Sequence, residues 1–162
     1  MSPSIQWSPP ANPFEFLEVA LPRDGDLRLV LAERMPAESN PWGVPAYSFR
    51  MENPSGGHLG RVRLRVGWNE DVIRYAGQVG YAVEPAHRGH HYAERACRLI
   101  APLAERHGMT SLWITCQPDN APSRRTLERL GAEFVETLDV PAGYPLDAGA
   151  LRQKMCFRLR LQ

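Results

Sequence analysis

The chain has 162 residues, 43% of them hydrophobic and 23% charged, and its 19 Lys and Arg nearly balance 18 Asp and Glu. This length predicts a single domain over residues 1–162, and the near-zero net charge argues against a nucleic-acid partner. No apolar run approaches the roughly 18 residues of a membrane span and no secretory pattern opens the chain, so we expect a cytoplasmic protein with no membrane partner and with reduced cysteines.

The first half of the chain predicts irregular structure followed by antiparallel strands. Residues 1–26 begin with a proline-rich stretch and are expected to be irregular, and prolines again interrupt regular structure over residues 35–45. A turn at Asn53-Pro54-Ser55-Gly56-Gly57 separates two strands that should form a hairpin. The predicted strands of this half are 27–31, 46–51, 58–66 and 75–83.

The second half alternates helices and strands. Apolar residues recur at helical spacing over 91–107, although Pro102 lies inside this segment and predicts a kink. Asn120 is suited to cap a second helix that ends at Gly131. The remaining predicted strands are 112–116, 134–140 and 155–161, with a loop over 141–152. This order predicts an α/β (α+β) domain with a mixed, mostly antiparallel central sheet of about six to seven strands flanked by helices.

The junction between the strand at 75–83 and the helix at 91–107 carries the chemistry. There the sequence reads Q-V-G-Y-A-V-E-P-A-H-R-G-H-H-Y-A-E-R-A from Gln78 to Ala96. The N-terminus of a helix offers unpaired backbone N–H groups and a partial positive charge, which together bind anions. Arg88 adds a full charge, and Gly89 lets the backbone approach a bulky ligand closely. The junction therefore indicates a phosphate or pyrophosphate site.

A second segment, N-A-P-S-R-R-T-L-E-R-L-G-A from Asn120 to Ala132, follows the next strand. The two segments together, in this order, resemble the GNAT superfamily of N-acetyltransferases over about residues 58–135. The superfamily motif Arg/Gln-x-x-Gly-x-Gly/Ala falls on residues 88–93. The resemblance implies a GNAT-like fold and an acetyltransferase that uses acetyl-CoA as cosubstrate and no metal.

The resemblance also implies which residues hold acetyl-CoA. Backbone amides over residues 89–93 would bind the pyrophosphate, the strand edge at residues 81–83 would pair with the pantetheine arm, and Asn120 would bond that arm. The N–H near Val83 would polarise the thioester carbonyl. The full set implied for the cofactor is Tyr81, Ala82, Val83, Arg88, Gly89, His90, His91, Tyr92, Ala93, Asn120 and Ser123.

Two positions depart from the family pattern. His91 stands at the usual central glycine of the first motif, where its side chain either crowds or contacts the phosphates. Leu127 stands where many relatives have the tyrosine that protonates the CoA thiolate. Ser123, which resembles the arrangement in ribosomal-protein acetyltransferases, is the candidate general acid. Glu84 is the candidate general base, acting through water, with Glu70 and Asp71 as reserves.

Each of these residues also has a structural explanation. Asn120 is a good helix cap by itself, Ser123 an ordinary first-turn residue and Glu84 a solvated carboxylate. A metal site at His87, His90, His91 and Glu94 is disfavoured because H-E-x-x-H spacing is absent. The acceptor, a small-molecule or peptide amine, stays open, and so does the oligomeric state, for which a homodimer is one candidate. The alternatives to an enzyme are a non-catalytic acyl-CoA-binding or sensor module of the same fold, and an interaction domain.

Overall fold

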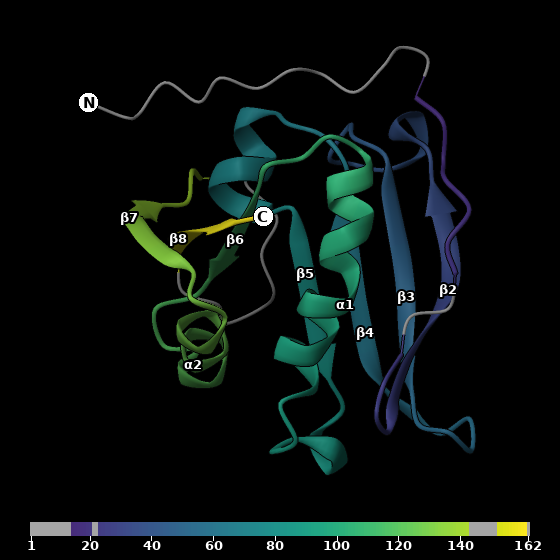
Figure 1. Ribbon diagram of the computed structural model, residues 1–162. Coiled ribbons are helices and arrows are strands. Elements are labelled where there is room, and N and C mark those ends of the chain that lie inside the picture. Colours follow the sequence, from purple (N-terminus) through teal and green to yellow (C-terminus); the bar gives the residue numbers. More distant parts are fainter. Residues whose placement is uncertain (1–13, 21–22, 143–151, 162) are drawn as a thin grey trace.

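The structure is a computed structural model that describes residues 14–20, 23–142 and 152–161. The predicted α+β class, with mostly antiparallel strands flanked by helices, is confirmed (Figure 1). The described strands form two sheets, one of five strands and one of three. The proline-rich start through Pro13 and most of the loop predicted over 141–152 lie outside the described residues.

The larger sheet contains the first strands of the chain in sequential order. Its order is β1-β2-β3-β4-β5, and every neighbouring pair is antiparallel. The predicted hairpin is confirmed, with Phe49 opposite Val62 in its register. The strands are β1 (Arg23–Asp24), β2 (Leu27–Met35), β3 (Ala46–Glu52), β4 (His58–Arg65) and β5 (Val79–Val83).

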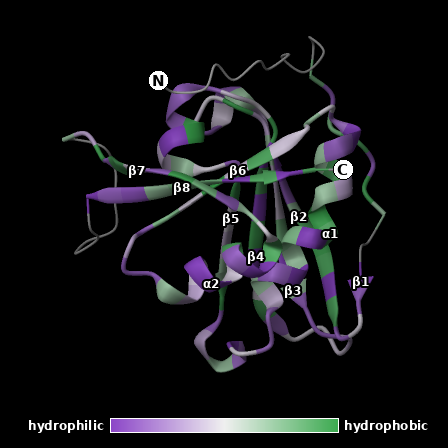
Figure 2. Ribbon diagram, turned by 60° about the vertical axis from the view of Figure 1, so that its left-hand side comes forward, coloured by the Kyte–Doolittle hydropathy of each residue, from purple (hydrophilic) through white to green (hydrophobic). Residues whose placement is uncertain are grey.

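Side chains alternate between the two faces of this sheet, as they must along extended strands. One face carries Leu29, Tyr47, Phe49 and Leu64, which are all buried in the hydrophobic core. The opposite face carries polar and charged residues, among them the exposed Arg50. Figure 2 shows this mixture as green and purple segments along the strands. The sheet therefore has one core face and one polar face.

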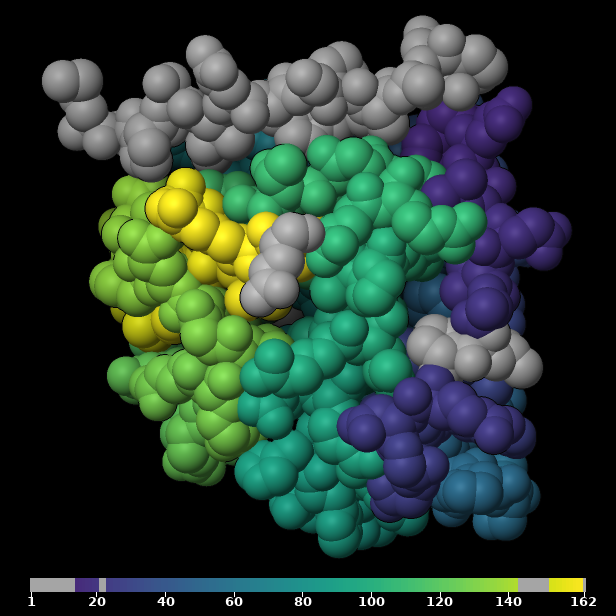
Figure 3. Space-filling model, viewed as in Figure 1, coloured from purple at the N-terminus to yellow at the C-terminus, as the bar shows by residue number. Residues whose placement is uncertain are grey.

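Two α-helices adjoin the core. Helix α1 (Tyr92–Arg106) buries Ala96, Ile100 and Leu103 against the core face and continues through Pro102. Helix α2 (Ala121–Leu130) begins at the Asn120 cap and ends at Gly131, as predicted. Figure 3 shows α1, in teal, between the purple N-terminal strands and the yellow-green α2. Among the described residues, no helix is both long and apolar enough to cross a bilayer.

The smaller sheet contains the strands of the second half. β6 (Ser111–Cys116), β7 (Glu133–Asp139) and β8 (Gln153–Arg160) match the predicted strands to within a few residues. Their order is β6-β8-β7, again antiparallel throughout. The last strand of the chain therefore lies between the other two.

Three predictions of local structure need correction. The irregular segment predicted to extend to residue 26 contains β1, because Gly25, at φ +57°, closes a two-residue turn onto β2. Short 3₁₀ segments occur at Ala37–Ser39 (η1), within the span predicted to be irregular, and at Pro85–His87 (η3). The strand predicted over 75–83 begins only at Val79. It is preceded by a π-helix, η2 (Val72–Ala76), which packs on β6 and β8. Two residues of this helix, Val72 and Ile73, are buried.

Candidate active site

The two sheets meet at Gln78, immediately before β5. Its backbone N–H donates to the Trp113 carbonyl at 2.6 Å, and its side-chain oxygen accepts the Trp113 N–H at 2.9 Å. Its side-chain amide also donates to the Gly67 carbonyl at 2.9 Å. Gln78 is only 2% exposed. This buried amide fixes the point from which β5 and β6 separate into different sheets.

Beyond Gln78, one edge of β5 has no strand partner within the described part of the chain. β5 pairs with β4 on its other side, with Tyr81 opposite Val62 and Ala82 opposite Arg61. The backbone N–H and C=O groups on the open edge can pair with an extended ligand, as in β-strand addition. The predicted residues Tyr81, Ala82 and Val83 all lie on this strand.

The loop after β5 leads directly to the N-terminus of α1. Gly89, at φ +96°, has no heavy atom within 4 Å of the place where a Cβ would lie. Residues 88–91 are all exposed, and the first N–H groups of α1 have no acceptor within the helix. Arg88 lies over the end of β5, since its Nε donates to the Val83 carbonyl at 3.3 Å. This open, positively charged helix start fits the phosphates of a CoA-type ligand.

His91 takes the backbone conformation that a glycine would take. It is the N-cap of α1 with φ 59° and ψ 29°, and among the described residues it is the one non-glycine residue with positive φ. Its side chain is exposed and caps no N–H group. The substitution for glycine thus keeps the course of the loop and leaves the imidazole at its surface. Tyr92 and Ala93, by contrast, are buried, so they can contribute only backbone to a ligand.

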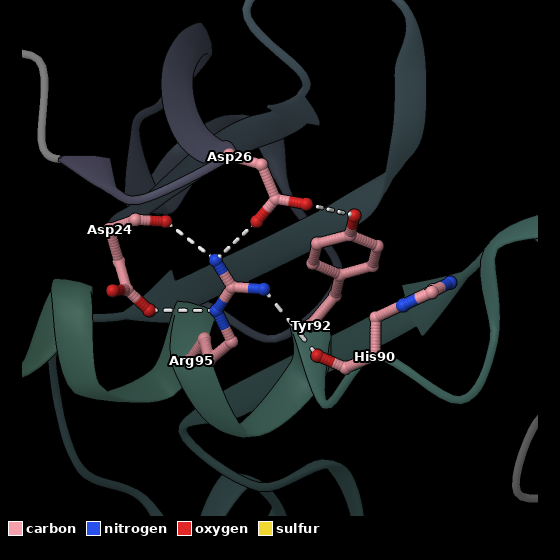
Figure 4. A network of polar contacts seen from close by, with 5 residues as sticks. All are labelled: Asp24, Asp26, His90, Tyr92 and Arg95. Carbon is pink, nitrogen blue, oxygen red and sulfur yellow. Dashed lines mark hydrogen bonds and ion pairs between the residues drawn. The ribbon is translucent and has the colours of Figure 1, made fainter.

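A polar network ties the start of α1 to the turn between β1 and β2 (Figure 4). Arg95 pairs with Asp24 at 2.7 Å and with Asp26 at 2.6 Å, and the Tyr92 hydroxyl donates to Asp26 at 2.8 Å. The hydrogen bond from Arg95, followed by that from Tyr92, lowers the pKa of Asp26. Arg95 is neutralised by these carboxylates, whereas Arg88 makes no ion pair among the described residues and remains available to a ligand at this loop.

Helix α2 presents the second predicted segment to β5. The Asn120 side chain accepts the Ser123 N–H at 3.2 Å, so the predicted capping role of Asn120 is confirmed. Ser123 is 8% exposed, and its hydroxyl lies 2.7 Å from the Tyr81 hydroxyl. Burial raises the pKa of Tyr81 far above its ordinary value, so its phenol stays protonated. Leu127 is fully buried in the core.

Glu84 directly follows Val83, the last residue of β5. Its N–H continues the β4–β5 pairing by donating to the Leu59 carbonyl, and its carboxylate is 3.4 Å from His58 Nε2. The side chain is 52% exposed, so water reaches it. The reserve acid Glu70 pairs with Arg74 at 3.2 Å, and Asp71 precedes η2. Glu94 pairs with Arg129 at 3.4 Å.

Comparison with known proteins adds a family match. The sequence model of a family described as "Acetyltransferase (GNAT) domain" matches residues 17–133. No sequence among curated proteins matches the chain significantly.

Solved structures with the same fold come from several bacteria. The ribosomal-protein-S5-alanine acetyltransferase from Vibrio fischeri has a TM-score of 0.65 at 14% identity, over 88% of this chain and 97% of that one. RimJ of Mycobacterium smegmatis, in complex with CoA-disulfide, has a TM-score of 0.57 at 20% identity, over 74% of this chain. YncA of Salmonella typhimurium, a putative acetyltransferase with its cofactor acetyl-CoA, has a TM-score of 0.56 at 19% identity, over 72% of this chain. The match spans 54% of RimJ and 65% of YncA, less than two thirds of either.

Proposed function

Because the chain belongs to the GNAT acetyltransferase family, we propose that it transfers the acetyl group of acetyl-CoA to a primary amine by direct attack in a ternary complex. The observation that carries this proposal is the open β5 edge, which leads through Arg88 and Gly89 into the N-terminus of α1. Solved structures of the same fold that hold CoA-disulfide or acetyl-CoA support the choice of cosubstrate.

We assign the cosubstrate to a continuous path along the molecule. The helix start at residues 89–93 and the Arg88 guanidinium would hold the pyrophosphate. The pantetheine arm would pair with Tyr81, Ala82 and Val83 along the open edge, where the Val83 region polarises the thioester carbonyl. The side-chain amide of Asn120, whose oxygen already caps α2, donates to no group among the described residues and would donate to that arm.

The transfer requires one attack and two proton movements. The amine nitrogen bonds to the thioester carbonyl carbon, and the carbon–sulfur bond breaks. Glu84 is our candidate base, since its carboxylate is accessible to a bridging water that removes the ammonium proton. Ser123 is our candidate acid for the departing thiolate, with the protonated Tyr81 phenol at 2.7 Å to replace its proton.

The non-catalytic alternative draws on one observation. Leu127 is fully buried, so no side chain at that position can reach a thiolate. A protein of this fold that binds acyl-CoA but does not transfer the acyl group would act as an acyl-CoA sensor. Turnover, and not binding, separates the two functions.

The test is an assay of thiol release from acetyl-CoA in the presence of a panel of small amines and short peptides. We expect release that depends on an amine and that falls about a hundredfold in Glu84→Gln. The variant Glu105→Gln, at an exposed site late in α1, is the matched control and should match wild type. Binding of acetyl-CoA without release for any amine would favour the sensor.

A further inference from the structure

The polar face of the five-stranded sheet carries a group of arginines. Arg50 lies opposite Arg61 in the β3–β4 register, and Arg63 lies opposite Ser48 on the same face. We call Arg50, Arg61 and Arg63 the arginine triad. Among the described residues, no side-chain hydrogen bond or ion pair involves any member of the triad. Arg63 Nε is buried without an acceptor among the described residues, and so is Nε of Arg28 on β2.

This arrangement does not help the chain to fold. Like charges directly opposite each other destabilise a sheet, and Arg50 and Arg61 form such a pair. Two acids lie on the same face, but Glu33 is opposite Ser48 and Glu52 is opposite Arg28. Neither acid is therefore opposite Arg50 or Arg61 in the β2–β3 register. A negatively charged ligand lying across the triad would turn this repulsion into attraction.

The triad adjoins the strand that carries the proposed thioester site. In the β4–β5 register, Arg61 lies opposite Ala82 and Arg63 lies opposite Gly80. Neighbouring strands are about 4.8 Å apart, so a ligand on the triad is one strand away from β5. Glu84, two residues after Ala82, follows on the same face by alternation. An acceptor arriving over this face would place its ammonium group near Glu84 and its anionic groups on the arginines.

We propose that the arginine triad docks an acidic polypeptide segment whose free amine is the acetyl acceptor. The inference rests on the proposed function and narrows its acceptor to one class. The exposed arginines spread over two strands of an open sheet face, which suits an extended chain, whereas small molecules bind in concave pockets. The formal net charge of +1 lacks the basic excess that phosphate contacts with a nucleic acid require, which disfavours nucleic acid.

The test uses two labelled peptides with a free N-terminal serine. In one peptide the serine is followed by glutamates that alternate with glycine, and in the other glutamines replace the glutamates. Binding is followed by fluorescence anisotropy at low ionic strength. We expect the acidic peptide to bind more tightly, and the double variant Arg50→Gln/Arg61→Gln to weaken it about fivefold to tenfold. Arg34→Gln is the matched control, because this exposed arginine lies opposite the core residue Tyr47, on the other face of the same sheet.

Several results would overturn the docking surface. These are equal affinity for both peptides, unchanged binding in the double variant, tighter binding of a single-stranded oligonucleotide of equal charge, and displacement of the peptide by equimolar O-phosphoethanolamine. Both substituted arginines are exposed, and a melting curve for each variant checks that it remains folded.

Acetylation of the same peptides separates this proposal from the proposed function. If the enzyme acetylates both peptides, kcat/KM should be higher for the acidic one, and the double variant should remove this preference. If the acidic peptide binds but acetyl-CoA does not, the proposed function fails while the docking surface stands. If acetyl-CoA turns over with other amines but discriminates against the acidic peptide, the docking proposal fails while the proposed function stands.

Discussion

The hydroxyl groups of Tyr81 and Ser123 lie 2.7 Å apart, joining the edge strand β5 to the first turn of α2. The contact links residues that are 42 positions apart in the chain. Ser123 is buried, and the burial of the Tyr81 phenol raises its pKa, so Tyr81 stays protonated at neutral pH. In the reaction that we propose, Ser123 of this pair donates the proton that the departing thiolate requires.

Replacing Ser123 tests this assignment. We expect Ser123→Ala to lower kcat about a hundredfold, because a general acid contributes that order of rate, with little change in acetyl-CoA affinity. Ser123→Thr keeps a hydroxyl group and should retain most activity, and Tyr81→Phe should have an intermediate effect. Steady-state thiol release gives kcat for each variant. Wild-type kcat in Ser123→Ala would remove Ser123 from the mechanism.

Replacing Gln78 tests the junction between the sheets. Gln78→Met keeps the volume but leaves the Trp113 N–H and the Gly67 carbonyl without their buried partner. We expect the free energy of unfolding to fall by about 2–4 kcal/mol. Urea denaturation measures the change, and Gln153→Met, at an exposed strand end, should change it by less than about 0.5 kcal/mol. A similar small loss for Gln78→Met would show that the junction does not depend on this amide.

Replacing His91 tests the left-handed cap of α1. A non-glycine residue in this conformation costs about 1–2 kcal/mol, part of which glycine offsets by its greater freedom in the unfolded chain. We therefore expect His91→Gly to be more stable than His91→Ala by about 1 kcal/mol in chemical denaturation. If instead the alanine variant is the more stable, the positive φ at residue 91 is wrong.

The stability of the protein should depend on pH through His107. Its Nε2 lies 2.7 Å from the Tyr47 hydroxyl, which also accepts the Leu17 N–H. Burial, and then the nearby Arg106, lower the pKa of His107 below its ordinary value of 6.5. As the pH falls through 6.5, the unfolded chain therefore binds a proton before the folded chain does, and stability falls.

Melting temperatures measured between about pH 7.5 and 5.5 test this dependence. Wild type should lose stability toward the lower pH, and His107→Gln should lose less, because glutamine does not titrate. Equal losses in the two proteins would assign the effect to other groups.

Local signals in the sequence predicted most of the elements. Asn120 and Gly131 bound α2 as expected, because capping is decided by residues close in the chain. The π-helix η2 was not predicted, since Ile73 and Tyr75 favour strands and packing against β6 and β8 overrides that preference. The division into two sheets was also missed, because it depends on the hydrogen bonds of Gln78 to Trp113.

The candidate site was predicted unevenly for the same reason. The loop through Arg88 and Gly89 is a backbone feature with a sequence motif, and its position could be predicted. The pairing of Arg95 with Asp24 joins residues 71 positions apart, and nothing near either residue signals it. The arginine triad depends on strand register, which a single sequence does not specify.

Calorimetric titration with acetyl-CoA decides whether the open β5 edge and the start of α1 bind the cosubstrate. We predict micromolar binding, about −8 kcal/mol, that weakens roughly tenfold in Arg88→Gln and is unchanged in Arg34→Gln. Absence of binding at millimolar acetyl-CoA would show that the open β5 edge and the start of α1 do not form a cosubstrate site.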